Sequence, residues 1–174
     1  MWARPSVLKT NLLAPVSLFY ERTLTRHLAL QASARWLSYT ARHNQWFVNA
    51  ALEARFYLDG AKRLEAHPHT AGFYMSLYLK ARYLRYINEI GYGFNKVGDL
   101  DEVVIRSLGF GLTLGHQWVG RRGFTGDVFI GGGTLPPALS QYEHTMRYSG
   151  VTSTNGFDYY SLDLRVGVSL GYAF

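Results

Sequence analysis

The last sixteen residues, Tyr159 to Phe174, alternate between apolar and polar side chains without a break. Successive side chains of a β-strand point to opposite faces, so one face of this segment is apolar and the other is polar and charged. The apolar face is aliphatic in the middle and aromatic at both ends, with Tyr160 at one end and Tyr172 and Phe174 at the other. This profile is typical of a transmembrane β-strand. At a rise of ~3.3 Å per residue and a tilt of ~45°, the segment is long enough to cross the membrane once.

Seven further segments show the same two-residue alternation, separated by residues typical of turns. We expect the first turn at Ala14-Pro15 and a polar outer loop from Thr134 to Asp158. An even number of strands places both termini on one side of the membrane. Residues 1–174 are therefore predicted to form a single domain, an all-β, eight-stranded antiparallel up-and-down transmembrane β-barrel. The seven segments are Ser6 to Leu12, Val16 to Leu24, Leu28 to Tyr39, Trp46 to Leu58, Phe73 to Tyr86, Val104 to Trp118 and Phe124 to Gly133.

The composition is consistent with such a barrel and excludes several other classes. Charged residues make up 17% of the chain, and glycine and aromatic residues are abundant, which favours sheet over helix. No stretch approaches 18 consecutive apolar residues, which excludes a helical membrane span. The net charge is +6, but the basic residues fall largely at alternating strand positions, so we expect no nucleic-acid partner. The lack of cysteine excludes disulfides and thiolate chemistry.

The polar faces of the predicted strands indicate which side of the barrel is its interior. They carry small residues, as a tight lumen requires, and acidic and basic residues in roughly balanced numbers. A soluble, lipocalin-like ligand-binding barrel would have the reverse arrangement and is kept as an alternative. We predict a polar, side-chain-filled lumen and no open channel, because eight strands leave room for side chains alone. The predicted lumen charge network consists of Lys9, Glu21, Arg35, Glu53, Arg55, Lys80, Arg82, Asp127, Asp163 and Arg165.

Aromatic residues suggest two further features. The ends of the apolar rows predict a girdle at the membrane interface, and His116 is expected in the same position on the lipid face. The residues of this girdle are Trp36, Trp46, Trp118, Tyr160 and Tyr172. The outer loop is the candidate contact site for outer-membrane protein partners, because aromatic and arginine residues favour interfaces. Its candidate residues are Tyr142, His144, Arg147, Tyr148 and Phe157.

Three sequence motifs resemble a known family. They are the run from Leu8 to Pro15 (LKTNLLAP), the Tyr-Glu-Arg at 20–22, and the run from Gly111 to Trp118 (GLTLGHQW). Together they resemble the small outer-membrane β-barrel proteins of Bacteroidetes that are grouped as a domain of unknown function, the DUF3575-type family. The end of the chain, with Leu170, Tyr172 and Phe174, resembles the signal by which barrel-assembly machinery recognises its substrates. The resemblance implies a fold and a location but no activity.

The expected location is the outer membrane of a Gram-negative cell envelope, with both termini in the periplasm. The first five residues lack the charged segment and the following apolar stretch of a signal peptide. Because a membrane barrel must be exported, we expect a form of the protein from which the signal has been removed.

No residue pattern predicts catalytic chemistry, a cofactor or a metal site. His67 and His69 lie in one turn without a carboxylate or thiol in a recognisable register, which makes a poor metal site. The sequence therefore favours a structural or interaction protein, not an enzyme and not a channel, that is an accessory subunit of a larger outer-membrane assembly. Its expected partners are the lipid bilayer, the barrel-assembly machinery and other outer-membrane proteins. A lipid-modifying outer-membrane enzyme that depends on a histidine is the alternative function.

Overall fold

The computed structural model describes residues 6–39, 45–58, 71–90, 99–120, 122–146, 152–154 and 162–174. These residues form ten β-strands and one short 3-10 helix. Their bounds are β1 (Ser6–Asn11), β2 (Ala14–Thr23), β3 (Leu28–Tyr39), β4 (Gln45–Tyr57), β5 (Gly72–Ile90), β6 (Asp99–Val119), β7 (Phe124–Thr134), η1 (Pro137–Leu139), β8 (Ser140–Met146), β9 (Thr152–Thr154) and β10 (Leu162–Ala173).

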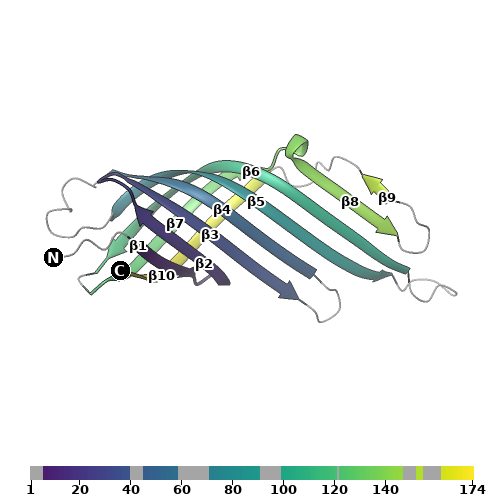
Figure 1. The fold of residues 1–174 in the computed structure, drawn as a ribbon, viewed down its shortest axis with the longest axis horizontal. Coiled ribbons are helices and arrows are strands. Elements are labelled where there is room, and N and C mark those ends of the chain that lie inside the picture. Colours follow the sequence, from purple (N-terminus) through teal and green to yellow (C-terminus); the bar gives the residue numbers. More distant parts are fainter. Residues whose placement is uncertain are drawn as a thin grey trace.

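Eight of these strands close into an antiparallel barrel in the order β1-β2-β3-β4-β5-β6-β7-β10 (Figure 1). The first and last strands pair with each other, from Val7 opposite Ala173 to Asn11 opposite Ser169. Backbone hydrogen bonds join Ser6 and Phe174 in both directions, at 3.3 and 2.8 Å. The two described ends of the chain therefore lie side by side at one end of the barrel, here called the terminal end, and the predicted eight-stranded antiparallel up-and-down barrel is confirmed.

Strands β5 and β6 continue beyond the barrel and form an extension at the far end. The last pair between β4 and β5 is Trp46 opposite Arg85, but β5 and β6 remain paired as far as Ile90 opposite Asp99. Strand β8 adds to the free edge of β6, and β9 adds to β8. We define the extension as residues 86–90, 99–107, 140–146 and 152–154. Figure 1 shows β8 and β9 at the opposite end of the molecule from the C-terminus.

The prediction of a loop from Thr134 to Asp158 was wrong for much of its length. Strand β7 leaves the edge of β6 opposite Phe110, and β8 returns to the same edge opposite Ser107 after an excursion over residues 135–139. Leu135 is buried and lies next to Gly109, where a Cβ atom would be 2.5 Å from Cδ2 of Leu135. The long strand β6 supplies the backbone hydrogen-bond partners of β8. The sequence of this polar, proline-containing segment alone does not indicate those partners.

The first turn also differs from its prediction at Ala14-Pro15. Strand β1 ends at Asn11, Leu12 and Leu13 form the turn, and Ala14 is already opposite Asn11 in β2. The side-chain oxygen of Asn11 accepts a hydrogen bond from the Leu13 backbone N–H at 2.9 Å. This local bond closes a tight turn, and proline is tolerated near the start of a strand. The β1–β2 hairpin is consequently the shortest part of the barrel wall.

The two faces of the barrel wall have opposite character. Large apolar side chains, such as Leu79, Phe110 and Leu164, are exposed on the outer surface. The largest fully buried side chains include charged and polar residues, among them Arg55, Lys9 and Glu21. The core of this protein is therefore polar and its surface is apolar, as predicted, which is the reverse of a lipocalin-like barrel.

Candidate functional site: the charged lumen and the apolar belt

Lys9 is the first centre of a buried ion network in the terminal half of the lumen. Its ammonium group donates to Glu21 Oε2 at 2.7 Å, to Gln117 Oε1 at 2.7 Å and to Asp127 Oδ2 at 3.0 Å. The side chains of Lys9 and Glu21 are 0% exposed, and that of Asp127 is 1% exposed. All three ammonium protons thus have acceptors, and two of these are carboxylates, which makes the buried charge tolerable.

Arg55 is the second centre of the same network. Its Nη1 donates to Asp127 Oδ2 at 2.8 Å and to Glu21 Oε2 at 3.1 Å, and its Nε donates to Glu53 Oε1 at 3.0 Å. Glu53 also accepts hydrogen bonds from Ser76 at 2.8 Å and from Gln31 at 3.3 Å. Charges from β1, β2, β4 and β7 therefore meet in one cluster across the lumen, and the alternation of side chains along each strand explains why they all point inward.

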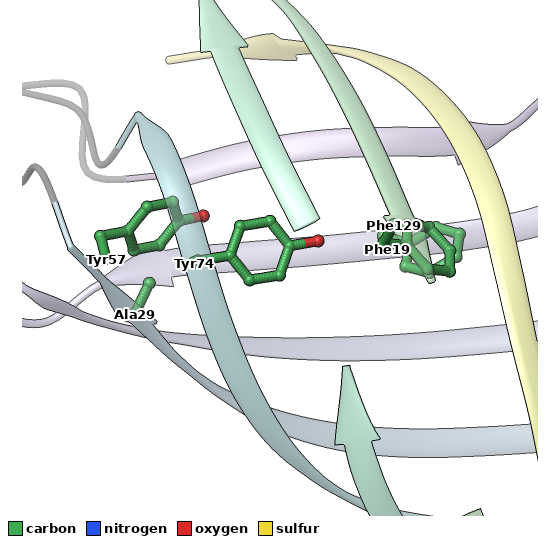
Figure 2. Packing of buried hydrophobic residues seen from close by; sticks show 5 residues of the cluster. All are labelled: Phe19, Ala29, Tyr57, Tyr74 and Phe129. Atoms are coloured by element: carbon green, nitrogen blue, oxygen red, sulfur yellow. The ribbon is translucent and has the colours of Figure 1, made fainter. Parts of the chain in front are cut away.

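Three tyrosines complete the network, although the sequence did not single them out. The hydroxyl groups of Tyr57, Tyr74 and Tyr78 donate to Glu21 at 2.9 Å, Asp127 at 2.9 Å and Asp163 at 2.8 Å, respectively. The rings of Tyr57 and Tyr74 lie 5.3 Å apart, and Figure 2 shows their hydroxyl groups directed the same way. Tyrosine fits both an interfacial girdle and a polar interior, so its type alone does not predict its face.

Glycines of β6 and β7 provide the space for the rings of Tyr74 and Tyr78. A Cβ atom on Gly111 would lie 2.6 Å from the Tyr78 hydroxyl, and one on Gly133 would lie 2.5 Å from it. The same strands carry Gly131, where an added Cβ would be 2.8 Å from Thr113 Cα. Gly131 and Gly133 are therefore close-packing positions of the barrel wall, because a side chain at either of them would meet a neighbouring backbone.

The far half of the lumen contains the remaining predicted charges. Lys80 forms an ion pair with Asp163, and Arg165 donates to Glu53 at 3.2 Å while lying over the Tyr78 ring at 4.4 Å. Eight of the ten predicted residues thus belong to ion pairs inside the barrel. The other two are half-buried: Arg35, which lies over the Phe47 ring at 5.7 Å, and Arg82, which is opposite Asn49 and Ser107.

An apolar belt surrounds the outside of the barrel and ends where the extension begins. Along β5 the belt includes the outward side chains from Phe73 to Tyr83, which span about 23 Å of depth at a tilt of ~45°. Beyond it lie two outward ion pairs, Arg85–Glu102 at 2.7 Å where the extension begins and Arg106–Glu143 at 3.3 Å within the extension. This change from apolar to charged side chains marks the far boundary of the belt.

Aromatic clusters lie at both boundaries of the belt. At the far end, the rings of Trp36 and Trp46 are 5.9 Å apart. At the terminal end, His116 lies 4.5 Å from Phe73 and 4.4 Å from Trp118. Tyr172 packs edge to face on Phe124 at 5.9 Å at the same end, and Leu170 and Phe174 are exposed beside it. Four residues of the predicted girdle therefore lie at the belt boundaries, and Tyr160 lies outside the described residues.

The residues predicted for a partner loop are only partly described. Tyr142 and His144 lie in β8, opposite Ile105 and Val103 of β6, so the prediction of a loop was wrong for them. Arg147, Tyr148 and Phe157 lie outside the described residues. Tyr142 is half-buried in the extension.

Two other features are absent from the described residues, a metal-ion site and a helix that could cross a membrane. Within them, no group of three or more histidine, aspartate or glutamate side chains is placed to hold a metal ion. The described part of the chain has no helix with the length and apolar character needed to cross a membrane.

The fold and the lumen define a class of protein, namely closed eight-stranded antiparallel β-barrels with a charged interior and an apolar exterior. Within this class, the family described as "Protein of unknown function (DUF3575)" matches residues 3–174, and the chain belongs to that family. No curated protein matches the chain.

Proposed function

We propose that this protein is a membrane-spanning barrel of a Gram-negative outer membrane that serves as a structural or interaction protein and not as a channel. The source implied by the sequence resemblance is a Bacteroidetes cell envelope. The single observation that carries the proposal is the inverted distribution of side chains, with an exposed apolar belt outside and a buried ion network inside. If this barrel were dissolved in water, it would expose large apolar patches, which soluble monomers rarely do.

The depth and boundaries of the belt support membrane insertion. Its depth of about 23 Å agrees with the ~25 Å apolar band of outer-membrane barrels, and aromatic side chains lie at both boundaries. In this arrangement the terminal end lies in the periplasm and the extension lies outside the cell. The exposed row of Leu170, Tyr172 and Phe174 is the proposed signal for the barrel-assembly machinery.

The lumen network is the reason to propose a protein that does not conduct. The side chains of Lys9, Glu21, Arg55 and Asp127 are at most 1% exposed and bond to one another across the terminal half of the lumen. A solute crossing this level would have to separate buried ion pairs, which costs several kcal/mol per uncompensated charge.

The extension supports a role in contacts with other envelope proteins. It raises a four-stranded sheet above the belt, and its outward face carries charged side chains, including Arg106 and Glu143. Within the described residues, β9 pairs with β8 alone, which leaves an edge that a partner strand can join.

Membrane insertion is tested by solubility and gel migration. We expect the protein to need detergent for extraction and its unboiled gel band to migrate differently from the boiled band, because a closed barrel resists unfolding by detergent alone. A monodisperse protein without detergent would contradict the proposal.

Non-conduction and partner contact need separate measurements. In planar bilayers we expect no ion conductance above the lipid background. A photo-crosslinking residue at Tyr142 in intact outer membranes should yield a discrete protein adduct, whereas one at Leu79 in the belt should yield none. Steady conductance, or identical adducts from both positions, would count against the proposed role.

A further inference from the structure

The barrel wall has a notch above the short β1–β2 hairpin. The hairpin turns at the level of Val168, whose carbonyl accepts the Leu12 N–H at 2.8 Å, and its last pair with β3 is Ser17 opposite Arg35. Beyond this level, residues 162–167 of β10 pair with β7 alone among the described residues, and residues 36–39 of β3 pair with β4 alone. Strands β10 and β3 are thus the two sides of the notch.

A cavity of about 110 Å³ lies behind the notch. Its lining includes Ala34, Leu164 and Val166, whose side chains are exposed on the outer surface, so the cavity reaches the wall of the barrel. Since a buried water needs about 10–15 Å³, this volume accommodates a small, solvated ionic group but not a nucleotide or a sugar chain.

The cavity is strongly cationic. Its described lining contains Arg35, Lys80 and Arg165 and no carboxylate. Lys80 pairs with Asp163 and Arg165 pairs with Glu53, but Glu53 is shared with Arg55. Arg35 forms no ion pair within the described part of the chain. Among the described side chains, the far half of the lumen therefore has more positive than negative charges.

Two arginines at this cavity also have donors without acceptors. Nε of Arg35 and Nη1 of Arg165 are buried and make no hydrogen bond to described residues. Buried donors of charged groups are normally satisfied, so an acceptor is expected here. The side-chain amides of Asn11 and Asn49 also line the cavity and can donate hydrogen bonds to the same acceptor.

We propose that this cavity binds a phosphate group, held by Arg35, Arg165 and Lys80. Guanidinium groups match the oxygens of phosphate in pairs, and an ammonium group adds a point charge. The group comes either from free phosphate entering at the far end or from an anionic phospholipid entering through the notch. The notch lies beside Trp36, at the belt boundary where lipid headgroups are expected. The lipid route rests on the proposed membrane location, whereas the free-phosphate route does not.

Two binding measurements distinguish these sources. Binding of free phosphate is measured by equilibrium dialysis of the folded protein in a neutral detergent with radiolabelled inorganic phosphate. Binding of an anionic phospholipid is measured in phosphatidylcholine nanodiscs that contain a trace of spin-labelled phosphatidylglycerol. The readout is the fraction of immobilised label. Binding in either measurement that depends on Arg35 supports the proposal and identifies the source. Phosphate binding by a protein that proves soluble without detergent would support the site while refuting the membrane location.

The variant Arg35→Gln removes the cation that has no carboxylate partner, and we expect it to weaken binding at least about tenfold. Asn49→Asp places a carboxylate opposite Arg35, so this internal anion should abolish binding. The control Arg26→Gln removes a charge from an exposed turn at the terminal end and should leave affinity unchanged. Each variant is first checked for the gel shift of the folded barrel. No binding in either measurement, or equal binding by wild type and Arg35→Gln, would overturn the proposal.

Discussion

Replacing Lys9 by methionine should destabilise the barrel more than any exposed charge change. Methionine has nearly the same length and volume as lysine, so the substitution removes the charge while keeping most of the packing. The ammonium group bonds to Glu21, Gln117 and Asp127 at 2.7 to 3.0 Å, and both carboxylates then remain buried beside Arg55. Removing one partner from a buried ion network typically costs about 3–5 kcal/mol, and we expect Lys9→Met to fall in this range.

A second substitution tests whether the cost comes from the surplus negative charge. Asp127→Asn removes one carboxylate charge, so the double variant Lys9→Met/Asp127→Asn should be more stable than the sum of the two single changes predicts. The coupling should be at least about 1 kcal/mol, because the two groups are in direct contact. Arg106→Gln is the control, since its ion pair with Glu143 is exposed and should be worth less than about 1 kcal/mol.

The assay is reversible urea unfolding in lipid vesicles, followed by tryptophan fluorescence and by the gel shift of the folded form. The free energy of unfolding is compared among the wild type, the two single variants, the double variant and the control. If Lys9→Met lowered the free energy of unfolding by less than about 1 kcal/mol, the buried network would be worth no more than a surface ion pair, and the reasoning would be refuted. Strict additivity in the double variant would show that the buried charges do not act together.

Two further matched pairs follow from the wall of the barrel. Gly111→Ala should lose about 1–3 kcal/mol in the same assay because its Cβ would meet the Gly132 carbonyl oxygen and lie 2.6 Å from the Tyr78 hydroxyl, whereas Gly132→Ala, with its nearest contact at 3.8 Å, should be close to neutral; equal losses would contradict the packing argument. Leu79→Arg in the middle of the belt should cost about 2–4 kcal/mol in vesicles, whereas Val104→Arg on the charged face of the extension should cost at most about 1 kcal/mol. Equal costs for this pair would place the belt boundary elsewhere.

Strand alternation predicts the barrel and most of its interior because every strand has one face in each environment. Residues such as Glu21, Arg55 and Asp127 lie at inward positions and meet across the lumen. Their spacing along each strand was sufficient to predict that they point inward. The partner of each charge was not predictable, because Lys9 bonds to Gln117 and Asp127, which are more than a hundred residues away. That pairing depends on the registers of all the intervening strands.

Features that depend on a neighbouring strand were not predicted from the sequence. Strand β8 forms because β6 extends past β7 and leaves part of the same edge free, and its own residues, such as Ser140 and Glu143, do not indicate a buried face. Strand alternation places the tyrosines at 57, 74 and 78 on the polar faces, but their hydroxyl groups are uncharged, so they were not assigned to the charge network. The notch is a difference in length between a hairpin and its neighbours, and no residue type encodes it.

The pairing of β1 with β10 has a kinetic consequence. Strand β10 is the last to be synthesised, yet Val7 is opposite Ala173 and Leu8 is opposite Tyr172. Lys9, in the first strand, cannot reach Asp127 in its final position until the strands between them have taken their places around the circumference. Contacts over such long separations make folding slow and delay the gain in free energy until a late step. The barrel should therefore fold in a nearly all-or-none reaction once β10 has been synthesised, and nascent fragments that lack β10 should not be protease-resistant.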